Sequence, residues 1–374
     1  MELGLFIMPS HPPERPLRQG HEFDLQALRW ADEFGYAEAW VGEHHSCPWE
    51  PNPAPDLLVA QALRETCRMR IGTGGFLLPY HHPAELANRA AFLDHISGGR
   101  YLFGIASGGL PSDWSMFNVD GMKGEHRLML EESLNIIMGL WGDDEAFEYK
   151  GKYWTVRKPT PNEEGTLRAH LKPLQMPHPP ISLSGLSVKS DTLKLCGERG
   201  FIPMSLNLNT GYVRGHWDTV VAGADAGGRV ADRGMWRVSR EICVAETEAA
   251  AWKLAVHGGL GRLWNEHLLP LFRNFKFLDY LKHAPDVADS DVTVEYLARH
   301  NWLVGTPEQV ADKAASMFDD LGGFGHLVML GTDYVEQPEA WRECMRLAAQ
   351  EVMPKIRHLQ PTVVSEPPRL RATG

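Results

Sequence analysis

The fold of this chain is decided by the stretch Ala39-Trp-Val-Gly-Glu-His-His-Ser-Cys-Pro-Trp-Glu-Pro-Asn-Pro53. Residues 39–42 are mainly apolar, which is typical of a short buried strand, and Glu43, His44 and His45 follow directly where that strand ends. Prolines at positions 48, 51 and 53 prevent the strand from continuing. The sequence therefore predicts three titratable side chains at the C-terminal end of a strand, which is the end of a parallel barrel where chemistry takes place.

Short apolar runs alternate with amphipathic helices along most of the chain. The predicted strands span residues 3–8, 39–42, 69–78, 101–106, 181–183, 201–206, 237–245 and 326–331. The predicted helices span residues 24–34 with Asp24 as the cap, 55–67, 83–97, 126–141, 189–199, 306–321 with a Thr306/Gln309 capping box, and 341–352. Eight strands with interleaved helices and no internal repeat predict an α/β fold, a (β/α)8 TIM barrel.

Two segments depart from this alternation. Residues 107–180 begin with a predicted long loop to residue 125 and contain, after a helix, a hairpin over residues 147–156. Residues 257–300 are rich in aromatic side chains without a clean period, and we expect them to lie over the barrel mouth. We interpret both segments as insertions, after the fourth and the seventh strand, in a single domain of residues 1–374.

Composition narrows the class of function. The formal net charge of -11, the pI near 5.9 and the lack of a Lys/Arg-rich run exclude nucleic acid and anionic membrane surfaces as expected partners. The five cysteines include no Cys-x-x-Cys pair, so neither a disulfide framework nor a thiolate zinc site is predicted. The N-terminal apolar run is short and carries an acidic residue, unlike a signal peptide or a membrane span. We therefore expect a soluble cytoplasmic enzyme.

The histidines at positions 44, 45, 81 and 82, with Glu43, raise the question of a metal site. Adjacent side chains on an extended segment point to opposite sides, and the separations match no usual ligand signature, so we predict no metal site. No Gly-x-Ser-x-Gly or paired Cys/His signature indicates a catalytic nucleophile. For His44, spacing alone is equally compatible with a catalytic role and with a strand-end histidine that bonds a backbone carbonyl.

Two small-residue segments suggest a bound ligand. Gly74 and Gly75 weaken a predicted strand, which chains accept where a flat group approaches the backbone or where the strand forms a bulge. Residues 184–191 leave a strand and open a helix, which offers backbone N–H groups and hydroxyls to a phosphate, although an ordinary helix cap explains them slightly better. Neither segment matches a Rossmann or P-loop pattern.

Four motifs together resemble one known family. They are Trp40-x-x-Glu43-His44-His45, then Ile71-Gly72-Thr73-Gly74-Gly75-x-x-Leu78-Pro79-x-x-His82-Pro83, then Gly99-Arg100-x-x-Phe103-Gly104-Ile105, and Val304-Gly305-Thr306-Pro307-Glu308-Gln309-Val310. The set resembles the bacterial luciferase-like, flavin-dependent monooxygenases over nearly the whole chain. Residues 52–58, 149–154 and 197–203 are similar to the limonene and diketocamphane monooxygenases within that superfamily.

The resemblance implies a two-component monooxygenase. Such a TIM barrel binds reduced FMN supplied by a separate flavin reductase, reacts it with O₂ through a C4a-peroxyflavin, and oxygenates a small apolar substrate by epoxidation, hydroxylation or Baeyer-Villiger chemistry. Residues 257–300 would form the lid that excludes water. The side chains of Leu110, Trp114, Met116 and Phe117 also suggest an apolar substrate. The family further implies a homodimer.

The resemblance also implies roles for individual residues. His44, Glu43 and Asp113 are the catalytic candidates, and His44, with an ordinary pKa near ~6.5, suits a proton-holding role at neutral pH. Gly74 and Gly75 are expected to form a non-prolyl cis peptide against the flavin ring. The cofactor-binding candidates are Gly74, Gly75, Thr73, Ala106, Ser107, Arg127, Gly185, Ser187 and Ser190. Luciferase has an arginine where this chain has Ser107, so part of the phosphate clamp is missing or supplied elsewhere.

Two alternatives use the same barrel. An F420-dependent oxidoreductase would turn over without oxygen, and a non-catalytic flavin-binding barrel would bind oxidised FMN and oxygenate nothing. The intact Glu43-His44-His45 segment makes the second alternative the less favoured one.

Overall fold

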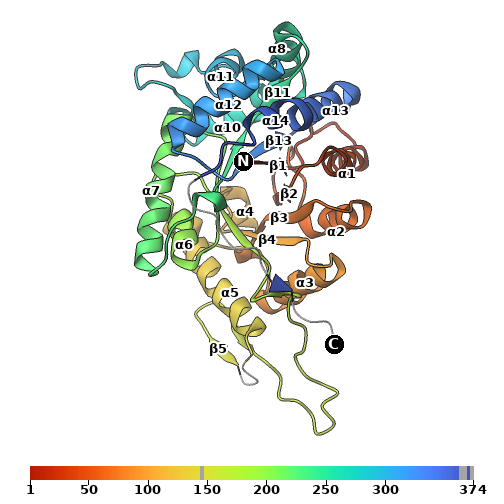
Figure 1. Ribbon diagram of the computed structural model, residues 1–374. Helices are drawn as coiled ribbons and strands as arrows, with labels where there is room; N and C mark the ends of the chain where they lie inside the picture. Colours follow the sequence, from red (N-terminus) through yellow and green to blue (C-terminus); the bar gives the residue numbers. More distant parts are fainter. Residues whose placement is uncertain (144–146, 362–368, 371–374) are drawn as a thin grey trace.

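Eight parallel strands close into a barrel in the computed structural model, which describes residues 1–143, 147–361 and 369–370. In the order in which neighbours pair, the strands are β1 (Glu2–Ile7), β13 (His326–Gly331), β10 (Arg237–Arg240), β9 (Ile202–Ser205), β8 (Ile181–Gly185), β4 (Tyr101–Ala106), β3 (Arg70–Leu77) and β2 (Glu38–Val41). Figure 1 shows the helices arranged around this barrel. The predicted (β/α)8 fold class is confirmed.

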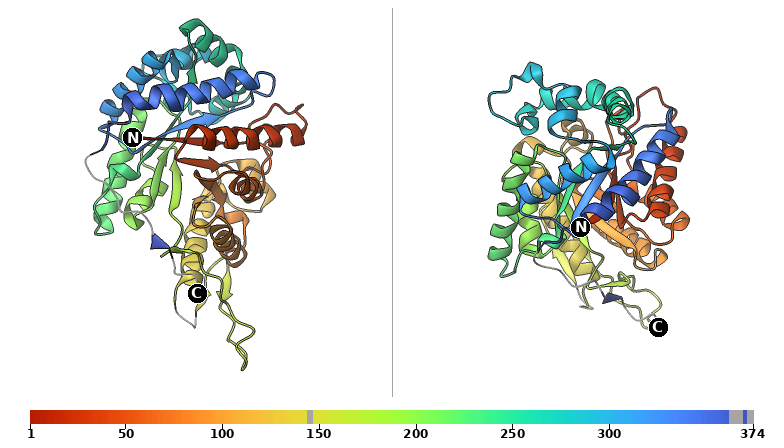
Figure 2. Two further views of the ribbon diagram at one scale, coloured as in Figure 1. Left: turned by 45° about the vertical axis from the view of Figure 1, so that its right-hand side comes forward. Right: turned by 45° about the horizontal axis from the view of Figure 1, so that its top comes forward.

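The surrounding helices begin where the sequence supplies a cap or a proline. They are α1 (Leu17–Phe34), α2 (Pro55–Glu65), α3 (Pro83–Ile96), α5 (Glu125–Trp141), α6 (Asp191–Arg199), α7 (Thr210–Ala226), α12 (Pro307–Leu321) and α13 (Pro338–Leu347), the last continued by the π-helical turn η7 (Ala348–Val352) and α14 (Met353–Ile356). The predicted Thr306/Gln309 capping box is present at the start of α12. The two further views in Figure 2 show the helices packed around the outside of the strands.

The structure corrects several predicted boundaries. Helix α1 begins at Leu17, so Asp24 is a buried residue inside the helix and not its cap. Helix α7 was not predicted, because its glycines and its even mixture of polar and apolar residues hide the helical period. The seventh predicted strand ends as a barrel strand at Arg240. After Glu241 the chain forms β11 (Ile242–Val244), which pairs with β12 (Leu303–Gly305) outside the barrel.

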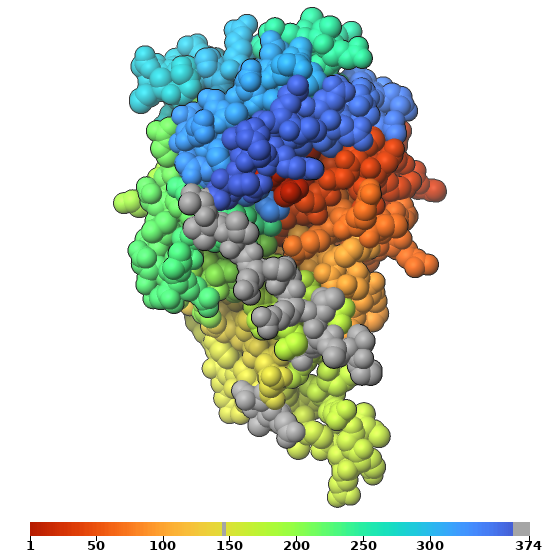
Figure 3. Space-filling model, viewed as in Figure 1, coloured from red at the N-terminus to blue at the C-terminus, as the bar shows by residue number. Residues whose placement is uncertain are grey.

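The segment after β4 is more ordered than predicted. The predicted long loop contains the short helix α4 (Pro111–Met116) and the turn η2 (Gly121–Lys123), because Pro111 and Asp120 each start a helical turn. The predicted hairpin is present as β5 (Glu148–Lys150) and β6 (Thr155–Arg157). Between β6 and β7 (Gln175–Met176), which pairs with β14 (Arg369–Leu370), the chain extends away from the barrel (Figure 3).

The segment after β11 is mostly helical. It contains α8 (Glu248–His257), α9 (Gly259–Leu263), the π-helical turn η4 (Trp264–Leu268), α10 (Leu269–Asn274), the 3-10 turns η5 (Leu278–Leu281) and η6 (Asp289–Asp291), and α11 (Val294–His300). Leu263 packs with Cys47 and Trp49, which belong to the loop after β2. The insertion therefore contacts the stretch from which the fold was predicted, as expected for a cover of the barrel mouth. In the part of the chain that the structure describes, no helix has the length and apolarity needed to cross a membrane.

The barrel interior is solid at its lower end. Phe6, Trp40, Leu102, Met204 and Val328 form one buried cluster inside the strands. Below it, the Glu38 carboxylate accepts hydrogen bonds from the Trp40 indole N–H at 2.9 Å and from Arg237 at 2.8 and 3.1 Å. A buried charge pair of this kind is stable only because its hydrogen bonds are satisfied.

A buried histidine connects three parts of the barrel rim. His11, in the loop after β1, lies 3.0 Å from Asp24 of α1 and 2.7 Å from Asp333 after β13. Burial lowers the His11 pKa, but the two carboxylates more than offset this and raise it to about 9. Arg15 adds two hydrogen bonds of 3.1 Å to Asp333. This ionic contact explains why Asp24 is buried inside α1.

We predict that His11→Asn destabilises the protein in a pH-dependent way. The folded-state pKa of about 9 lies above the ordinary value of 6.5, so the charge contributes fully below pH 6.5 and its contribution is lost as the pH rises through 9. Urea unfolding at pH 6 should show a loss of about 3 kcal/mol relative to the unsubstituted protein, and at pH 10 a much smaller loss. His21→Asn, which removes a hydrogen bond at the exposed surface, is the control. An equal loss at both pH values would contradict the assignment.

Candidate active site

The interior-facing side chains become accessible toward the C-terminal end of the barrel. Side chains alternate along a strand, and the lower interior-facing residues are almost fully buried. Nearer the C-terminal end of the strands, the residues on the same side are partly exposed; they are Met8, His44, Gly74, Ala106, Ser184 and Leu330. These residues come from six different strands or from the positions just after them. The barrel interior is therefore closed in its lower half and solvent-accessible at the end where His44 lies, and we call the space bounded by these partly exposed residues the recess.

Gly74 of β3 is one of these partly exposed residues, and Gly75 beside it is buried. The Gly74–Gly75 peptide is cis, as the family resemblance implied. The pairing of β3 with β4 shifts between Thr73 and Phe76, so the bulge that the sequence left open is present. A Cβ atom on Gly74 would lie 2.9 Å from the Trp40 Cβ, and one on Gly75 would lie 2.5 Å from the Ile105 nitrogen. Only glycine fits at these two positions, because the backbone packs closely against Trp40 and β4.

His44 lies between two carboxylates. Its Nδ1 is 3.6 Å from Asp113 Oδ2, and its Nε2 is 3.4 Å from Glu50 Oε2. Burial lowers the pKa of His44, but Asp113 and Glu50 outweigh burial and raise it above its ordinary value. Asp113, on the first turn of α4, is fixed by the Ser46 hydroxyl and by the Ser46 N–H at 2.9 Å. The imidazole thus faces two carboxylates. The alternative from the sequence, a strand-end histidine bonded to a backbone carbonyl, would have placed a carbonyl there.

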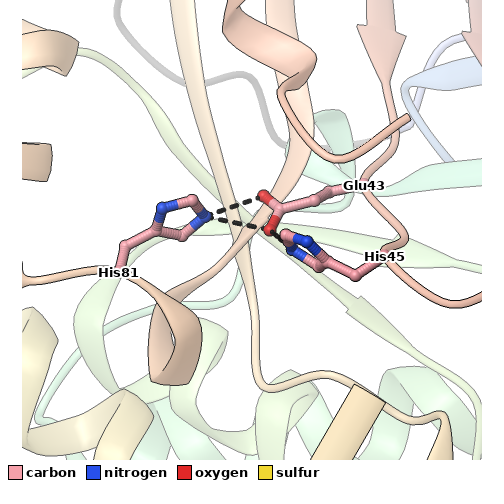
Figure 4. Close-up of side chains that lie close together, drawn as sticks. All are labelled: Glu43, His45 and His81. Carbon is pink, nitrogen blue, oxygen red and sulfur yellow. Dashed lines mark hydrogen bonds and ion pairs between the residues drawn. The ribbon is translucent and has the colours of Figure 1, made fainter. Parts of the chain in front are cut away.

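Glu43 points to the opposite side of the same segment. Its Oε1 lies 2.7 Å from the His45 ring and 2.9 Å from the His81 ring, and its Oε2 accepts the Leu77 N–H at 3.2 Å (Figure 4). The side chain has no exposed surface, and the two imidazoles lower its pKa although burial opposes this. Glu43 therefore joins the loop after β2 to the end of β3, and its oxygens are already engaged within the protein.

Two clusters have the residue types of metal ligands. Glu43, His45 and His81 form one, and Cys47, Glu50 and His267 form the other. Hydrogen bonds among the members account for the first cluster without an ion. In the second, burial raises the pKa of the Cys47 thiol to about 12, so the thiol stays protonated at neutral pH and is a poor ligand. We identify neither cluster as a metal site, and the prediction of no metal stays a prediction.

The predicted phosphate residues gather at the start of α6. Arg127 of α5 pairs with Asp191 at 2.9 Å, and both side chains are largely exposed. Ser190 accepts the Leu193 N–H as the helix cap, so the ordinary-cap explanation holds for Ser190. Ser187 is exposed one turn before it. Gly185 is buried, and a Cβ there would meet Leu193 at 2.4 Å, so this glycine also serves helix packing.

The other predicted contacts divide between the recess and the surrounding structure. Ala106 and Ser107 are partly exposed where β4 ends at the recess. Thr73 is fully buried, and its hydroxyl donates to the Gly104 carbonyl at 2.8 Å, so only its backbone is available to a ligand. Leu110 packs beside Trp49.

The remaining aromatic residues of this loop serve packing. Phe117 stacks on Tyr80 with ring centres 4.4 Å apart, and the Trp114 ring lies 5.0 Å from that of His126. Met116 is 65% exposed.

Sequence reasoning missed several polar residues of the site. Glu50 lies inside the quoted stretch 39–53, and His81 was considered only as a metal ligand, because their neighbours could not be known without the fold. His267 was passed over in an insertion without clear periodicity. Glu241 sits where β10 ends, and its carboxyl accepts the Trp264 indole N–H at 3.0 Å and an Asn207 hydrogen bond. Burial raises the Glu241 pKa to about 7. A lone acidic residue inside an apolar strand was the signal that could have indicated it.

Comparison with known proteins agrees with this geometry. The family model for luciferase-like monooxygenases matches residues 1–323. The chain is 33% identical over 366 residues to 2,5-diketocamphane 1,2-monooxygenase 1 of Pseudomonas putida, covering 96% of this chain and 99% of that protein. It is 29% identical over 360 residues to limonene 1,2-monooxygenase of Rhodococcus erythropolis, covering 95% and 86% of the two chains.

A solved structure shows the same fold in a related enzyme. The oxygenating constituent of 3,6-diketocamphane monooxygenase from Pseudomonas putida, a type II Baeyer-Villiger monooxygenase in complex with FMN, superposes with a TM-score of 0.90 at 31% identity. The match covers 95% of this chain and 98% of that one. The closed barrel and these relatives define the class of this protein as a TIM-barrel flavin-dependent monooxygenase. This chain belongs to the luciferase-like monooxygenase family.

We predict that Glu43→Ala destabilises the protein strongly. The substitution leaves two imidazoles and the buried Leu77 N–H without their acceptor. An unsatisfied buried donor costs about 1–3 kcal/mol, so the free energy of unfolding should fall by roughly 2–4 kcal/mol in urea titrations. Glu22→Ala removes an exposed carboxylate of α1 that pairs with Arg18, and it should change stability by less than about 0.5 kcal/mol. Equal effects of the two substitutions would contradict this account of Glu43.

Proposed function

We propose that this chain is the oxygenating component of a two-component monooxygenase that uses reduced FMN and O₂ to oxygenate a small apolar organic molecule. The observation that carries the proposal is that His44, flanked by two carboxylates, and Gly74 of β3 are both partly exposed at the same end of the barrel. Family membership and the FMN complex of the 3,6-diketocamphane relative support the choice of flavin.

The residues present fit FMN. Gly74 is partly exposed at the recess, and a Cβ at Gly74 or Gly75 would collide with Trp40 or Ile105, so only glycine backbone is available to an isoalloxazine ring there. Ala106 and Ser107 lie at the adjacent strand end. The exposed Ser187 and Arg127 would hold the phosphate at the start of α6, where Ser190 caps the helix. Reduced FMN, when bound, supplies the electrons that activate O₂ for insertion of one oxygen atom into the substrate.

The protein's own contribution is to orient groups, hold a proton and exclude water. His44 carries a raised pKa because Asp113 faces its Nδ1 and Glu50 faces its Nε2, so these two carboxylates favour the protonated ring. Asp113 keeps the ring oriented. Glu43 acts indirectly, because its hydrogen bonds with His45, His81 and Leu77 fix the segment that carries His44. Residues 257–300, packed on the loop after β2, keep water from the recess.

The substrate and partners follow from the same features. Met8, Ala106 and Leu330 give the recess apolar surface, which favours a small hydrocarbon-like substrate bearing at most a carbonyl or an alkene. The family's use of an oxygenase component leads us to propose a separate flavin reductase as partner. We further propose a homodimer in the cytoplasm, with residues 1–374 as one domain.

The test is oxygen incorporation. Purified protein mixed with chemically reduced FMN and ¹⁸O₂, with a panel of cyclic ketones and terpenes, should give a product heavier by one labelled oxygen atom. His44→Ala should lower the yield by at least about 100-fold, since a positioned proton donor contributes roughly that much. His21→Ala, on the outer face of α1, should leave the yield unchanged.

Two results would overturn the proposal. Turnover that proceeds equally well without O₂ would favour an F420-dependent oxidoreductase. Tight binding of oxidised FMN without any labelled product from the panel would favour a non-catalytic flavin-binding barrel.

A further inference from the structure

A second buried carboxylate contacts His44 from the side opposite Asp113. Glu50, five residues before the first residue of α2, is 7% exposed. Its Oε2 lies 3.4 Å from His44 Nε2 and 3.8 Å from His267 Nε2, and its Oε1 accepts a Ser10 hydrogen bond at 3.5 Å. A carboxylate this deeply buried is stable only beside positive charge or hydrogen-bond donors. Among the described residues, the two imidazoles are its ion-pair partners.

His267 brings the insertion into this contact. It lies on the π-helical turn η4, and its ring stacks on Trp49 with centres 5.7 Å apart and an interplanar angle of 12°. The same ring nitrogen lies 3.6 Å from the Cys47 sulfur. The His267 ring is therefore fixed on one face by an aromatic side chain and at its edge by the loop that carries Glu50.

We propose that Glu50 and His267 are positioning residues for His44, with His267 of the insertion holding the Glu50 carboxylate that holds the His44 ring in the recess. The inference rests on the proposed function in one respect, namely that His44 is the proton-holding group. It adds that the covering insertion sets the orientation and charge of that group, and so does more than exclude water.

The charges around His44 are supplied by several elements. Asp113 faces it from α4, Glu50 from the loop after β2, and His267 reaches it through Glu50 from η4. Glu43 is its neighbour in the chain, but its oxygens are engaged by His45 and His81. Burial raises the Glu50 pKa, and the two histidines outweigh burial and lower it, so Glu50 is ionised at neutral pH.

The experiment measures the pKa of His44 by NMR titration of its imidazole in the flavin-free protein. Glu50→Gln should lower the His44 pKa by about one pH unit, because one of the two facing carboxylates is lost. Glu50→Asp keeps the negative charge, so it should lower the His44 pKa less than Glu50→Gln does.

A double-mutant cycle tests the link to the insertion. His267→Asn should move the His44 pKa by about half a pH unit or more when Glu50 is present, and by much less in the Glu50→Gln background. Glu14→Gln is the matched control, because Glu14 pairs with Arg262 of the insertion but does not face His44. Circular dichroism of each variant establishes that it folds. If Glu50→Gln does not fold, the His44 pKa is compared between the unsubstituted protein and Glu50→Asp.

Two outcomes would overturn the inference. An unchanged His44 pKa in Glu50→Gln removes Glu50 from the network. Equal effects of His267→Asn in both backgrounds mean that His267 does not act through Glu50. The titration uses no flavin, so an unchanged His44 pKa would leave the monooxygenase proposal intact. Absence of labelled product, with the Glu50 and His267 effects on the His44 pKa present, would overturn only the monooxygenase proposal.

Discussion

The alternation of side chains along a single segment, β2 and the residues that follow it, organises this protein. Glu38 and Trp40 face the barrel interior, where one forms the buried charge pair with Arg237 and the other fills the centre. Four residues beyond Trp40, His44 lies at the recess, while Glu43 points the other way and joins the loop to β3. A shift of one residue would exchange these roles, because the period of a strand is two. The register of β2 against β1 and β3 therefore fixes both the stability of the barrel and the direction of its imidazole.

Much of this arrangement could be read from the sequence. Apolar runs separated by capped helices predicted the eight strands, because buried parallel strands and amphipathic helices leave strong periodic signals. The prolines at 48, 51 and 53 marked the loop, and the paired glycines marked the place where the backbone lies bare. The motifs identified the family, although the roles they implied for individual residues remain predictions.

The parts that could not be predicted depend on tertiary contacts. Asp24 was taken for a helix cap because aspartate favours caps, yet its burial is explained by His11, which lies 13 residues away in sequence. Glu50 and His267 are 217 residues apart, and no local pattern relates them. Glu241 lay inside the predicted strand of residues 237–245, and only the fold shows that the barrel strand ends just before it. Local propensity finds elements, whereas pairs of buried charges are found only once the elements are placed.

The pairing of β11 with β12 has a consequence for how the barrel mouth is covered. The chain leaves the barrel at Glu241 and returns beside the same point, since Ile242 lies opposite Leu303 and Val244 opposite Gly305. The two ends of the intervening helical segment are thus joined by the short parallel sheet of β11 and β12. Because the closure entropy of such an excursion grows slowly with its length, the loops between these helices can lengthen without disturbing the eight barrel strands. The helices themselves are tied to the barrel, since Leu260 and Trp264 belong to its main hydrophobic core and the Trp264 indole donates to Glu241. Variation in the molecules that enter the recess is therefore expected in those loops and not in the helices that pack on the barrel.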